Sequence, residues 1–384
     1  MVNKIAVVTG TRAEFGLLQP LIDLIVADRE TELQLIVTGM HLSPEFGMTV
    51  EEIREAGYDI ADEIEILLSS DTGVGTAKSV GLATIGFADT LCRLSPDWLV
   101  VLGDRFEILA AATAAMLIGK PIAHIHGGER TEGVIDEPIR HSVTKMSVLH
   151  FVATPEYRKR VIQLGESPDR VFHVGAIGLD RIREENLLTR EQLANDLRID
   201  SSKTWCTVTF HPVTLDPDSV EESVYALVGA MRSRPDLFFV MTKANADEAG
   251  RKVNRVLTSY ADAAENAALF DSLGSQRYLS CVKASALVLG NSSSALIEAP
   301  YLKTPSVDIG IRQQGRARGE SVVHCGERQS EIEAAIEQAL AIGEDEVFQS
   351  SPYFNGGAAL PILQTLKSVP SKRIKSFHDV QFTI

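Results

Sequence analysis

The chain has 384 residues, of which 45 % are hydrophobic and 23 % are charged. This composition is typical of a globular protein and excludes extended disorder and a collagen-like repeat, and at roughly 150 residues per domain the length predicts two domains. The formal net charge of −15 disfavours non-specific binding to nucleic acid, because such binding depends on Lys and Arg side chains that neutralise phosphates.

Hydrophobic runs and cysteines restrict the class of protein further. No apolar run in the sequence reaches the roughly 20 residues needed to cross a bilayer. The apolar stretch near the N-terminus is too short for the core of a signal peptide, so we expect a cytoplasmic protein without membrane contact. The four cysteines form no C-x-x-C pair, which indicates neither a disulfide framework nor a zinc site and predicts reduced, mostly buried thiols.

Short apolar runs rich in Val and Ile recur through the first half of the chain, as expected of strands that are buried on both faces of a parallel sheet. These runs are residues 4–10, 33–39, 97–104, 121–128 and 148–154. Helical patterns at 17–27 and 106–118 lie between them. This alternation predicts a doubly wound α/β domain.

The pattern restarts in the second half, after a polar helical stretch at 180–197. Its apolar runs are residues 204–212, 237–243, 286–291 and 305–310. We therefore predict an α/β fold of two Rossmann-like domains that face a cleft, with the functional side chains just after the strands. The predicted domains are 1–177, joined by the C-terminal segment 365–384, and 178–364.

Two strand ends in the first half carry charged groups. Gly10 to Gly16 forms a turn into a helix whose N-terminus favours an anion, and it holds Arg12 and Ala13. It lacks the G-x-G-x-x-G dinucleotide fingerprint, and it is equally readable as a loop with a surface arginine. Asp104 and Arg105 follow the 97–104 run and could act as a base and an anion clamp, or form an exposed ion pair.

The segment 124–141 concentrates three histidines and three carboxylates. On a helix, Asp136 and Arg140 share one face because they are four residues apart. On a strand, His124 and His126 alternate and point to opposite faces, which does not suit two ligands of one metal. We expect one of these two histidines to be a packed residue, and we predict no metal.

In the second half, His211 ends the first strand and lies at the inferred cleft. Ser292 and Ser293 stand at a strand-to-helix turn that favours a phosphate, although a plain serine N-cap explains them as well. Glu298, one helical turn later, could accept hydrogen bonds from a ribose diol, and Arg312 is a second candidate anion clamp. Together these groups indicate a nucleotide-sugar enzyme.

The chain resembles the hydrolysing UDP-N-acetylglucosamine 2-epimerases of sialic-acid biosynthesis from about Lys4 to Val323. The motifs that carry the resemblance are GTRAEFGLL, MHLSPEFG, GDRFE, HIHGGERTEGVIDEPIRHSVTKMS, HPVT and GNSSSALIEAP…IGIRQQGR. The resemblance implies the glycosyltransferase-B architecture, in which the active site lies between two Rossmann-like domains. It also implies that UDP is eliminated to give 2-acetamidoglucal, whose hydration releases N-acetylmannosamine, without a metal or redox cofactor.

The resemblance also implies roles for individual residues. Asp104 and Asp136 are the acid/base candidates, and Arg140 orients Asp136. Some relatives carry Glu at the strand-tip position of His126, so His126 itself or Glu129 is the candidate replacement. The residues implied to contact the diphosphate, the nucleotide or the sugar are Arg12, Ala13, His41, Arg105, His211, Asn245, Ser292, Ser293, Glu298 and Arg312.

Other functions remain open at this stage. The same reaction on UDP-2,4-diacetamido-2,4,6-trideoxyglucose or on a GDP-linked analogue fits the motifs equally, because no motif identifies the substituents at C4 and C6. A non-hydrolysing epimerase, a glycosyltransferase of the same architecture and a non-catalytic nucleotide-sugar-binding regulator are further alternatives. The expected partners are a nucleotide sugar and further copies of the chain in a homodimer or homotetramer, with no nucleic acid and no membrane.

Overall fold

The computed structural model describes residues 2–70, 72–131, 135–184, 186–212, 220–244, 248–343, 351–371 and 374–381. The chain divides into two compact units. The first comprises Met1–Glu129, Ile135–Arg181 and Tyr353–Ile384, and the second comprises Arg130–Val134 and Ile182–Pro352. The chain thus changes units at 129/130, 134/135, 181/182 and 352/353, whereas the predicted limits are 177/178 and 364/365.

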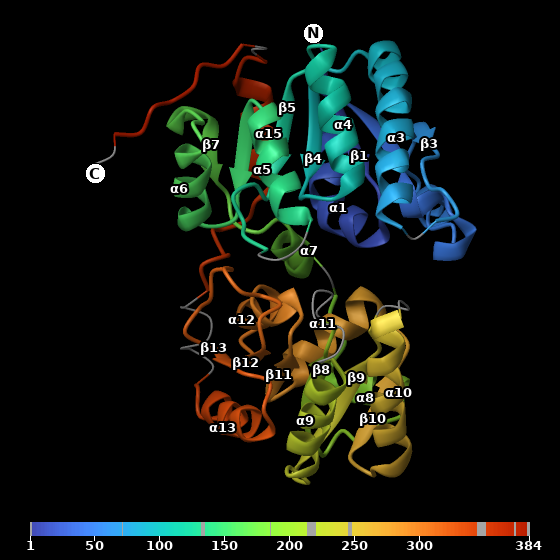
Figure 1. Ribbon diagram of the computed structural model, residues 1–384, viewed down its shortest axis with the longest axis vertical. Coiled ribbons are helices and arrows are strands. Elements are labelled where there is room, and N and C mark those ends of the chain that lie inside the picture. The colour runs from blue at the N-terminus through green and yellow to red at the C-terminus, as the bar shows by residue number, and fades with distance from the viewer. Residues whose placement is uncertain are drawn as a thin grey trace. The chain divides into compact units, whose positions relative to one another are not determined.

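The first unit is built on a parallel sheet of seven strands in the order β3-β2-β1-β4-β5-β6-β7. Figure 1 labels β3, β1, β4, β5 and β7 of this sheet. The strands are β1 (Asn3–Thr9), β2 (Thr31–Thr38), β3 (Ile60–Ile64), β4 (Trp98–Leu102), β5 (Ile122–Ile125), β6 (Leu149–Val152) and β7 (Val171–His173). Strands β4, β5 and β6 are buried throughout and β1 is buried from its third residue onward, which explains their apolar sequences.

Helices cover both faces of this sheet, and each face has its own apolar core. The helices are α1 (Arg12–Ala27), α2 (Val50–Glu55), α3 (Gly73–Leu94), α4 (Phe106–Leu117), α5 (Asp136–Met146), α6 (Pro155–Gln163), α7 (Gly178–Glu184) and α15 (Ala359–Ser368). Short 3₁₀ helices are η1 (Gly39–Leu42), η2 (Pro44–Phe46) and η3 (Pro168–Arg170). Side chains of α1 and α15 pack on one face, and side chains of α3, α4 and α5 pack on the other.

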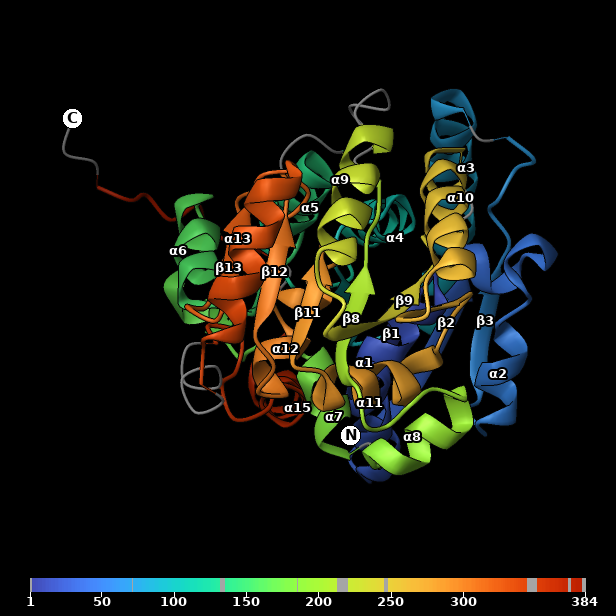
Figure 2. The ribbon, with the colours of Figure 1, turned by 90° about the horizontal axis from the view of Figure 1, so that it is seen from below.

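The second unit has a parallel sheet of six strands in the order β10-β9-β8-β11-β12-β13. Figure 2 shows β12, β11 and β8 of this sheet side by side. The strands are β8 (Thr204–Thr209), β9 (Leu237–Thr242), β10 (Ala267–Phe270), β11 (Leu287–Gly290), β12 (Ser306–Ile309) and β13 (Val322–Cys325). Its helices are α8 (Arg190–Leu197), α9 (Val220–Arg232), α10 (Glu248–Ala263), α11 (Gly274–Ala284), η4 (Ser293–Ala295), α12 (Glu298–Tyr301) and α13 (Gln329–Leu340). Two parallel α/β units of this kind confirm the predicted pair of Rossmann-like domains.

The strands that the sequence pattern missed are all edge strands. All nine predicted strands are present in the two sheets, whereas β3, β7, β10 and β13 carried no recognisable pattern. These four strands end the two sheets, so part of each stays exposed or half-buried. A half-exposed strand does not need the continuous apolar run by which a buried strand is recognised.

In the described part of the chain, no helix is long and apolar enough to cross a membrane.

A buried carboxylate joins the C-terminal helix α15 to the first unit. Asp180 of α7 accepts hydrogen bonds from the backbone N–H groups of Ala358, at 2.8 and 3.0 Å, and of Ala359, at 2.6 Å. At the other end of α15, the indole Nε1 of Trp98 donates to the carbonyl oxygen of Leu366 over 3.0 Å. Both ends of α15 are therefore attached to elements from the first half of the chain.

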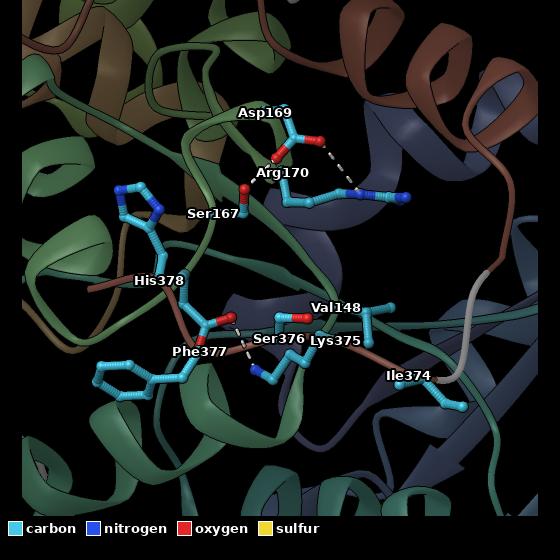
Figure 3. Close-up of a pocket in the computed structure, with 10 residues that line it drawn as sticks. Val148, Ser167, Asp169, Arg170, Ile374, Lys375, Ser376, Phe377 and His378 are labelled. Atoms are coloured by element: carbon cyan, nitrogen blue, oxygen red, sulfur yellow. Dashed lines mark hydrogen bonds and ion pairs between the residues drawn. The ribbon is translucent and has the colours of Figure 1, made fainter. Parts of the chain in front are cut away.

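The segment that follows α15 crosses the outer part of the same unit, where Figure 3 shows the residues that line a cavity of about 290 Å³. Lys375 donates to the buried Glu166 carboxylate over 2.7 Å, and Lys145 and His150 contact the same carboxylate. These contacts hold the pKa of Glu166 near 2, although burial alone would raise it. The C-terminal segment, to which the sequence analysis assigned no structure, is thus held by an ion cluster.

Replacing Asp180 by Ala removes the cap of α15 and should lower the free energy of unfolding of the first unit by about 2 kcal/mol. Urea unfolding followed by Trp98 fluorescence in a Trp205→Phe background measures this unit, since Trp98 lies in the first unit and Trp205 in the second. Glu156→Ala, which removes an exposed ion pair with Arg160, is the control and should cost less than about 0.5 kcal/mol. Equal effects of the two variants would contradict the capping role.

Candidate active site

The predicted site residues of the first unit follow the carboxyl ends of its inner strands. All strands of the sheet are parallel, so these ends lie at one edge, the usual ligand edge of an open α/β sheet. Arg12 and Ala13 follow β1, and His41 follows β2. The Asp104–Arg105 pair follows β4, and His126 and Glu129 follow β5.

The buried Arg140 connects three other predicted residues. The Arg140 side chain is 3 % exposed and forms ion pairs with two carboxylates, those of Asp104 and of Glu129, the latter at 3.0 Å. Glu129 is equally buried, and its other oxygen lies 3.2 Å from Nδ1 of His126. The residues Asp104, Arg140, Glu129 and His126, called the Arg140 network below, therefore form one continuous chain of charged and polar contacts.

The backbone at His126 corrects one expectation. β5 ends at Ile125, and His126 adopts a φ of +64°, in the left-handed region that side chains rarely occupy. His124 and His126 therefore do not alternate along one strand. The N–H of Ile177 donates to Nε2 of His126 over 3.4 Å, which assigns the ring proton to Nδ1, the atom that faces Glu129.

His124 is the packed histidine of the pair, as expected. It is fully buried and contacts the carbonyl oxygen of Gly103 at 2.8 Å and the hydroxyl of Thr144 at 3.2 Å. Burial lowers the pKa of His124 to about 3, so the ring is neutral. Its contact with Gly103 stabilises the loop that carries Asp104.

Asp136 and Arg140 lie on α5 with the predicted four-residue spacing. The Asp136 side chain is half-buried. The pKa of Arg105 is raised although burial lowers it, mainly by Glu107 and to a smaller extent by the charges of Glu14 and Asp136. The negative charge of Asp136 therefore contributes to the electrostatic surroundings of Arg105.

A buried carboxylate that the sequence analysis did not single out fixes Arg105. Glu107 is fully buried in the first turn of α4 and accepts from Arg105 Nε at 3.2 Å and from Nη2 at 3.0 Å. The guanidinium also lies over the ring of Phe106, at 5.9 Å from its centroid. The GDRFE motif contained this residue, but the burial that gives it a positioning role cannot be read from a single carboxylate in a sequence.

A second missed carboxylate, Glu14, is buried in the first turn of α1 and accepts from the N–H of Gly10 over 2.7 Å. Burial and the nearby Glu107 raise the pKa of Glu14 to about 7. By contrast, the Arg12 guanidinium is largely exposed and pairs with Glu52 at 2.9 Å, and Ala13 is exposed. These two predicted residues lie at the edge but outside the buried cluster.

His41, predicted in a loop near the sugar, is buried in η1. Its ring nitrogens contact the hydroxyls of Thr9 at 3.0 Å and Thr49 at 2.8 Å. Burial lowers the pKa of His41 to about 4, so it is neutral at physiological pH. Its contacts link the β2 loop to the end of β1.

In the second unit, the side chain of Asn291 ties the ends of two strands together. Its Oδ1 accepts from the N–H of His211 and its Nδ2 donates to the carbonyl of His211, both over 2.7 Å. The carbonyl oxygen of Asn291 accepts from Arg312 Nη1 at 3.0 Å and from Gln313 at 2.9 Å. Asn291, which the sequence analysis did not assign, therefore holds His211 and Arg312 beside the turn that begins at Ser292, called the serine turn below.

The serine turn begins at Ser292, whose hydroxyl accepts from the N–H of Ser294 over 3.4 Å and caps η4. Ser293 is half-buried, and Glu298 begins the next short helix. Burial raises the pKa of Glu298, while the Ser294 hydroxyl and the charge of Arg316 act in the opposite direction. Asn245, the remaining predicted nucleotide-site residue, lies outside the described residues.

The two units thus gather the predicted residues into two separate groups. The group in the first unit consists of carboxylates, a histidine and arginines, and the group in the second consists of hydroxyls, a carboxylate, a histidine and an arginine near a strand-to-helix turn. Among the residues that the structure describes, no group of three or more His, Cys, Asp or Glu side chains could hold a metal ion.

The chain is similar to known proteins of one family. A family model described as UDP-N-acetylglucosamine 2-epimerase matches residues 25–367. The chain is 42 % identical over 322 residues to the GDP/UDP-N,N′-diacetylbacillosamine 2-epimerase (hydrolyzing) of Campylobacter jejuni, covering 84 % of each chain. It is 33 % identical to the UDP-N,N′-diacetylbacillosamine 2-epimerase (hydrolyzing) of Legionella pneumophila, covering 96 % of this chain and 97 % of that one.

Among solved structures, the UDP-GlcNAc 2-epimerase of Neisseria meningitidis bound to UDP-GlcNAc superposes with a TM-score of 0.81. It covers 95 % of this chain and 100 % of the other at 18 % identity, so this likeness concerns the fold alone.

The Glu14 carboxyl should make stability depend on pH. Its pKa is near 7 in the folded chain and 4.5 when exposed, so folding favours its protonated form. That stabilisation is complete below pH 4.5 and is lost as the pH rises through 7. Relative to Glu14→Gln, which stays neutral, the wild type should lose about 3 kcal/mol between pH 4.5 and 8.

Urea unfolding of both proteins at pH 5 and pH 8 checks this difference, with Trp98 fluorescence as the probe of the first unit. Parallel pH profiles for the wild type and Glu14→Gln would show that Glu14 keeps an ordinary pKa.

Proposed function

The chain belongs to the hydrolysing branch of the UDP-N-acetylglucosamine 2-epimerase family, and from this premise we propose that it acts on nucleotide-linked N,N′-diacetylbacillosamine. This sugar is 2,4-diacetamido-2,4,6-trideoxyglucose, which the sequence analysis held as an alternative substrate. The two reported relatives, at 42 % and 33 % identity, both carry this sugar in their names. UDP-N-acetylglucosamine, the first choice of the sequence analysis, is the second candidate because the matching family model bears its name.

The proposed reaction has two steps. A base removes the proton from C2, the C1–O bond to the diphosphate breaks, and a C1=C2 double bond forms in the enclosed sugar. Water then adds across this bond, with the hydroxyl at C1 and a new proton at C2 on the opposite face. The products are the free 2-epimer and a nucleoside diphosphate.

The single observation that carries this proposal is the Arg140 network. Two carboxylates, Asp104 and Glu129, contact one buried guanidinium, which lies between them and holds both in position. The reaction needs one group to remove a proton and another to return one to the opposite face. We assign the first task to Asp104, whose carboxylate contacts Arg140, and Asp136, whose charge acts on Arg105, is the second candidate for it.

His126 and Glu129 supply the other acid/base group in this proposal. Some relatives carry Glu at the position of His126, and here Nδ1 of His126 lies 3.2 Å from a Glu129 oxygen. Such a pair can take up or release a proton near neutral pH, because imidazole titrates in this range and the carboxylate stabilises its cation. This contact supports the replacement of the missing Glu by a His–Glu pair.

The nucleotide side of the proposal rests on the second unit. Ser292 and Ser293 would bind the diphosphate at the serine turn, with His211 and Arg312 held beside them by Asn291. Glu298 would accept hydrogen bonds from the ribose hydroxyls. Arg12 and Arg105 would stabilise the leaving diphosphate from the first unit.

Asp104→Asn should retain nucleotide binding and lose between about 100-fold and 10 000-fold in kcat, because it removes a charge and a proton acceptor at nearly constant volume. The measurement is steady-state release of the nucleoside diphosphate, with UDP affinity determined by calorimetry on the same protein. Normal turnover would remove Asp104 from the mechanism.

Glu298→Ala should act on binding instead of chemistry. Loss of the ribose contact is expected to weaken UDP binding about tenfold, the effect of one charge-assisted hydrogen bond. Calorimetric titration with UDP and with inorganic pyrophosphate tests this, since only UDP carries the ribose. Unchanged affinity for UDP would refute the ribose role.

Proton NMR in D₂O tests the function itself. The purified protein is incubated separately with UDP-2,4-diacetamido-2,4,6-trideoxyglucose, its GDP analogue and UDP-N-acetylglucosamine, without an acceptor. We expect a free 2-epimer deuterated at C2, equimolar with nucleoside diphosphate, fastest from a diacetamido substrate. Thermal stabilisation by these compounds without turnover would instead indicate a nucleotide-sugar-binding regulator.

A further inference from the structure

A cavity of about 510 Å³ lies within the first unit, apart from the Arg140 network. This volume falls in the range of small-molecule sites, typically 300–1,000 Å³. Its wall comes from three loops that follow β2, β3 and β4, together with the first turns of α3. Because these strands are parallel, the cavity opens at the same edge of the sheet as the proposed acid/base groups.

Direct contacts connect the cavity to the proposed site. Phe106 lines it, and the guanidinium of Arg105 lies over the ring of Phe106 at 5.9 Å from its centroid. Arg105 Nη2 also approaches the sulfur of Met40 at 3.7 Å, at the start of the loop that continues to Ser43 in the cavity wall. A nucleotide sugar whose diphosphate is held at Arg105 therefore has the cavity beside it.

The chemistry of the wall excludes a phosphate and favours a neutral, partly apolar group. Phe46, Leu67, Leu68 and Phe106 supply apolar surface. Five hydroxyl side chains line the remainder, and a hydroxyl both donates and accepts hydrogen bonds. Glu45 is the one charged residue among the described residues that line the cavity, and its charge repels an anion.

The hydroxyls include some that are already ordered. Ser79 is buried on α3, and Ser70 contacts the hydroxyl of Thr72 at 3.0 Å while Thr72 caps the same helix. Such hydroxyls can satisfy the N–H and C=O of an acetamido group, and the apolar side chains can cover its methyl.

We propose that this cavity binds the 4-acetamido and 6-methyl groups of the sugar and thereby selects a diacetamido-trideoxy substrate. The inference rests on the proposed function, which it makes more specific. N-Acetylglucosamine carries hydroxyls at C4 and C6, so it offers the apolar wall no methyl groups to bury at these two positions.

A pair of matched leucines provides the test. Leu68 lines the cavity and is 39 % exposed, whereas Leu82 on α3 lies outside it and is 46 % exposed. Leu68→Ala should lower kcat/KM for the diacetamido nucleotide sugar about tenfold and change that for UDP-N-acetylglucosamine less than about twofold. Leu82→Ala should leave both values within about twofold of the wild type.

Three outcomes would overturn the proposal. Equal losses on both substrates would place a group common to both sugars in the cavity, and no loss on either would leave the cavity without a role in substrate binding. Equal effects of Leu68→Ala and Leu82→Ala would indicate a general loss of stability. In contrast, a wild-type protein that releases nucleoside diphosphate from neither substrate would contradict the proposed function.

A binding measurement keeps the inference testable without turnover. In an Asp104→Asn background, Thr76→Phe fills the cavity, and Thr84→Phe is its control because Thr84 lies two turns further along α3, outside the wall. We expect Thr76→Phe to weaken calorimetric binding of the diacetamido nucleotide sugar about tenfold or more, with unchanged affinity for UDP. Unchanged affinity for the nucleotide sugar would show that the cavity does not hold its substituents.

Discussion

The buried guanidinium of Arg140 imposes the main constraint on the first unit. A charge with only 3 % of its side chain exposed is stable only when opposite charges compensate it. Asp104 arrives from the end of β4 and Glu129 from the turn after β5, so α5 has to lie where its arginine reaches both. Loss of either carboxylate leaves the guanidinium with one ionic partner instead of two, so the position of Arg140 depends on both contacts.

The backbone around this arginine is held in conformations that the rest of the fold supports. Gly103 has a φ of +75° and His126 a φ of +64°, so the backbone turns sharply just beyond β4 and again just beyond β5. His124 bonds to the carbonyl of Gly103 and thereby connects these two turns, while the N–H of His126 donates to the Phe151 carbonyl on β6. The parallel sheet thus acts as the rigid support, and the side chains with proposed chemistry stand on the turns that leave it.

The sequence predicted the interior of this protein well and its margins less well. Buried strands have continuous apolar runs, whereas the edge strands β3, β7, β10 and β13 share their surface with solvent and show no such pattern. In the site, the motifs identified Asp104, Arg140 and Glu129. Glu14, Glu107 and Asn291 were missed because their roles come from burial and from contacts across the fold, which the spacing of residues in a sequence does not reveal.

The central claim is that Asp104 acts through its contact with Arg140 as one unit, which a double-mutant cycle measures most directly. kcat is determined for Asp104→Asn, Arg140→Lys and the double variant on the preferred nucleotide sugar. If the two residues act together, kcat of the double variant should be no more than about threefold below kcat of the less active single variant. Losses that multiply, with the double variant reduced by the product of the two single effects, would show that the residues act independently and would contradict this account.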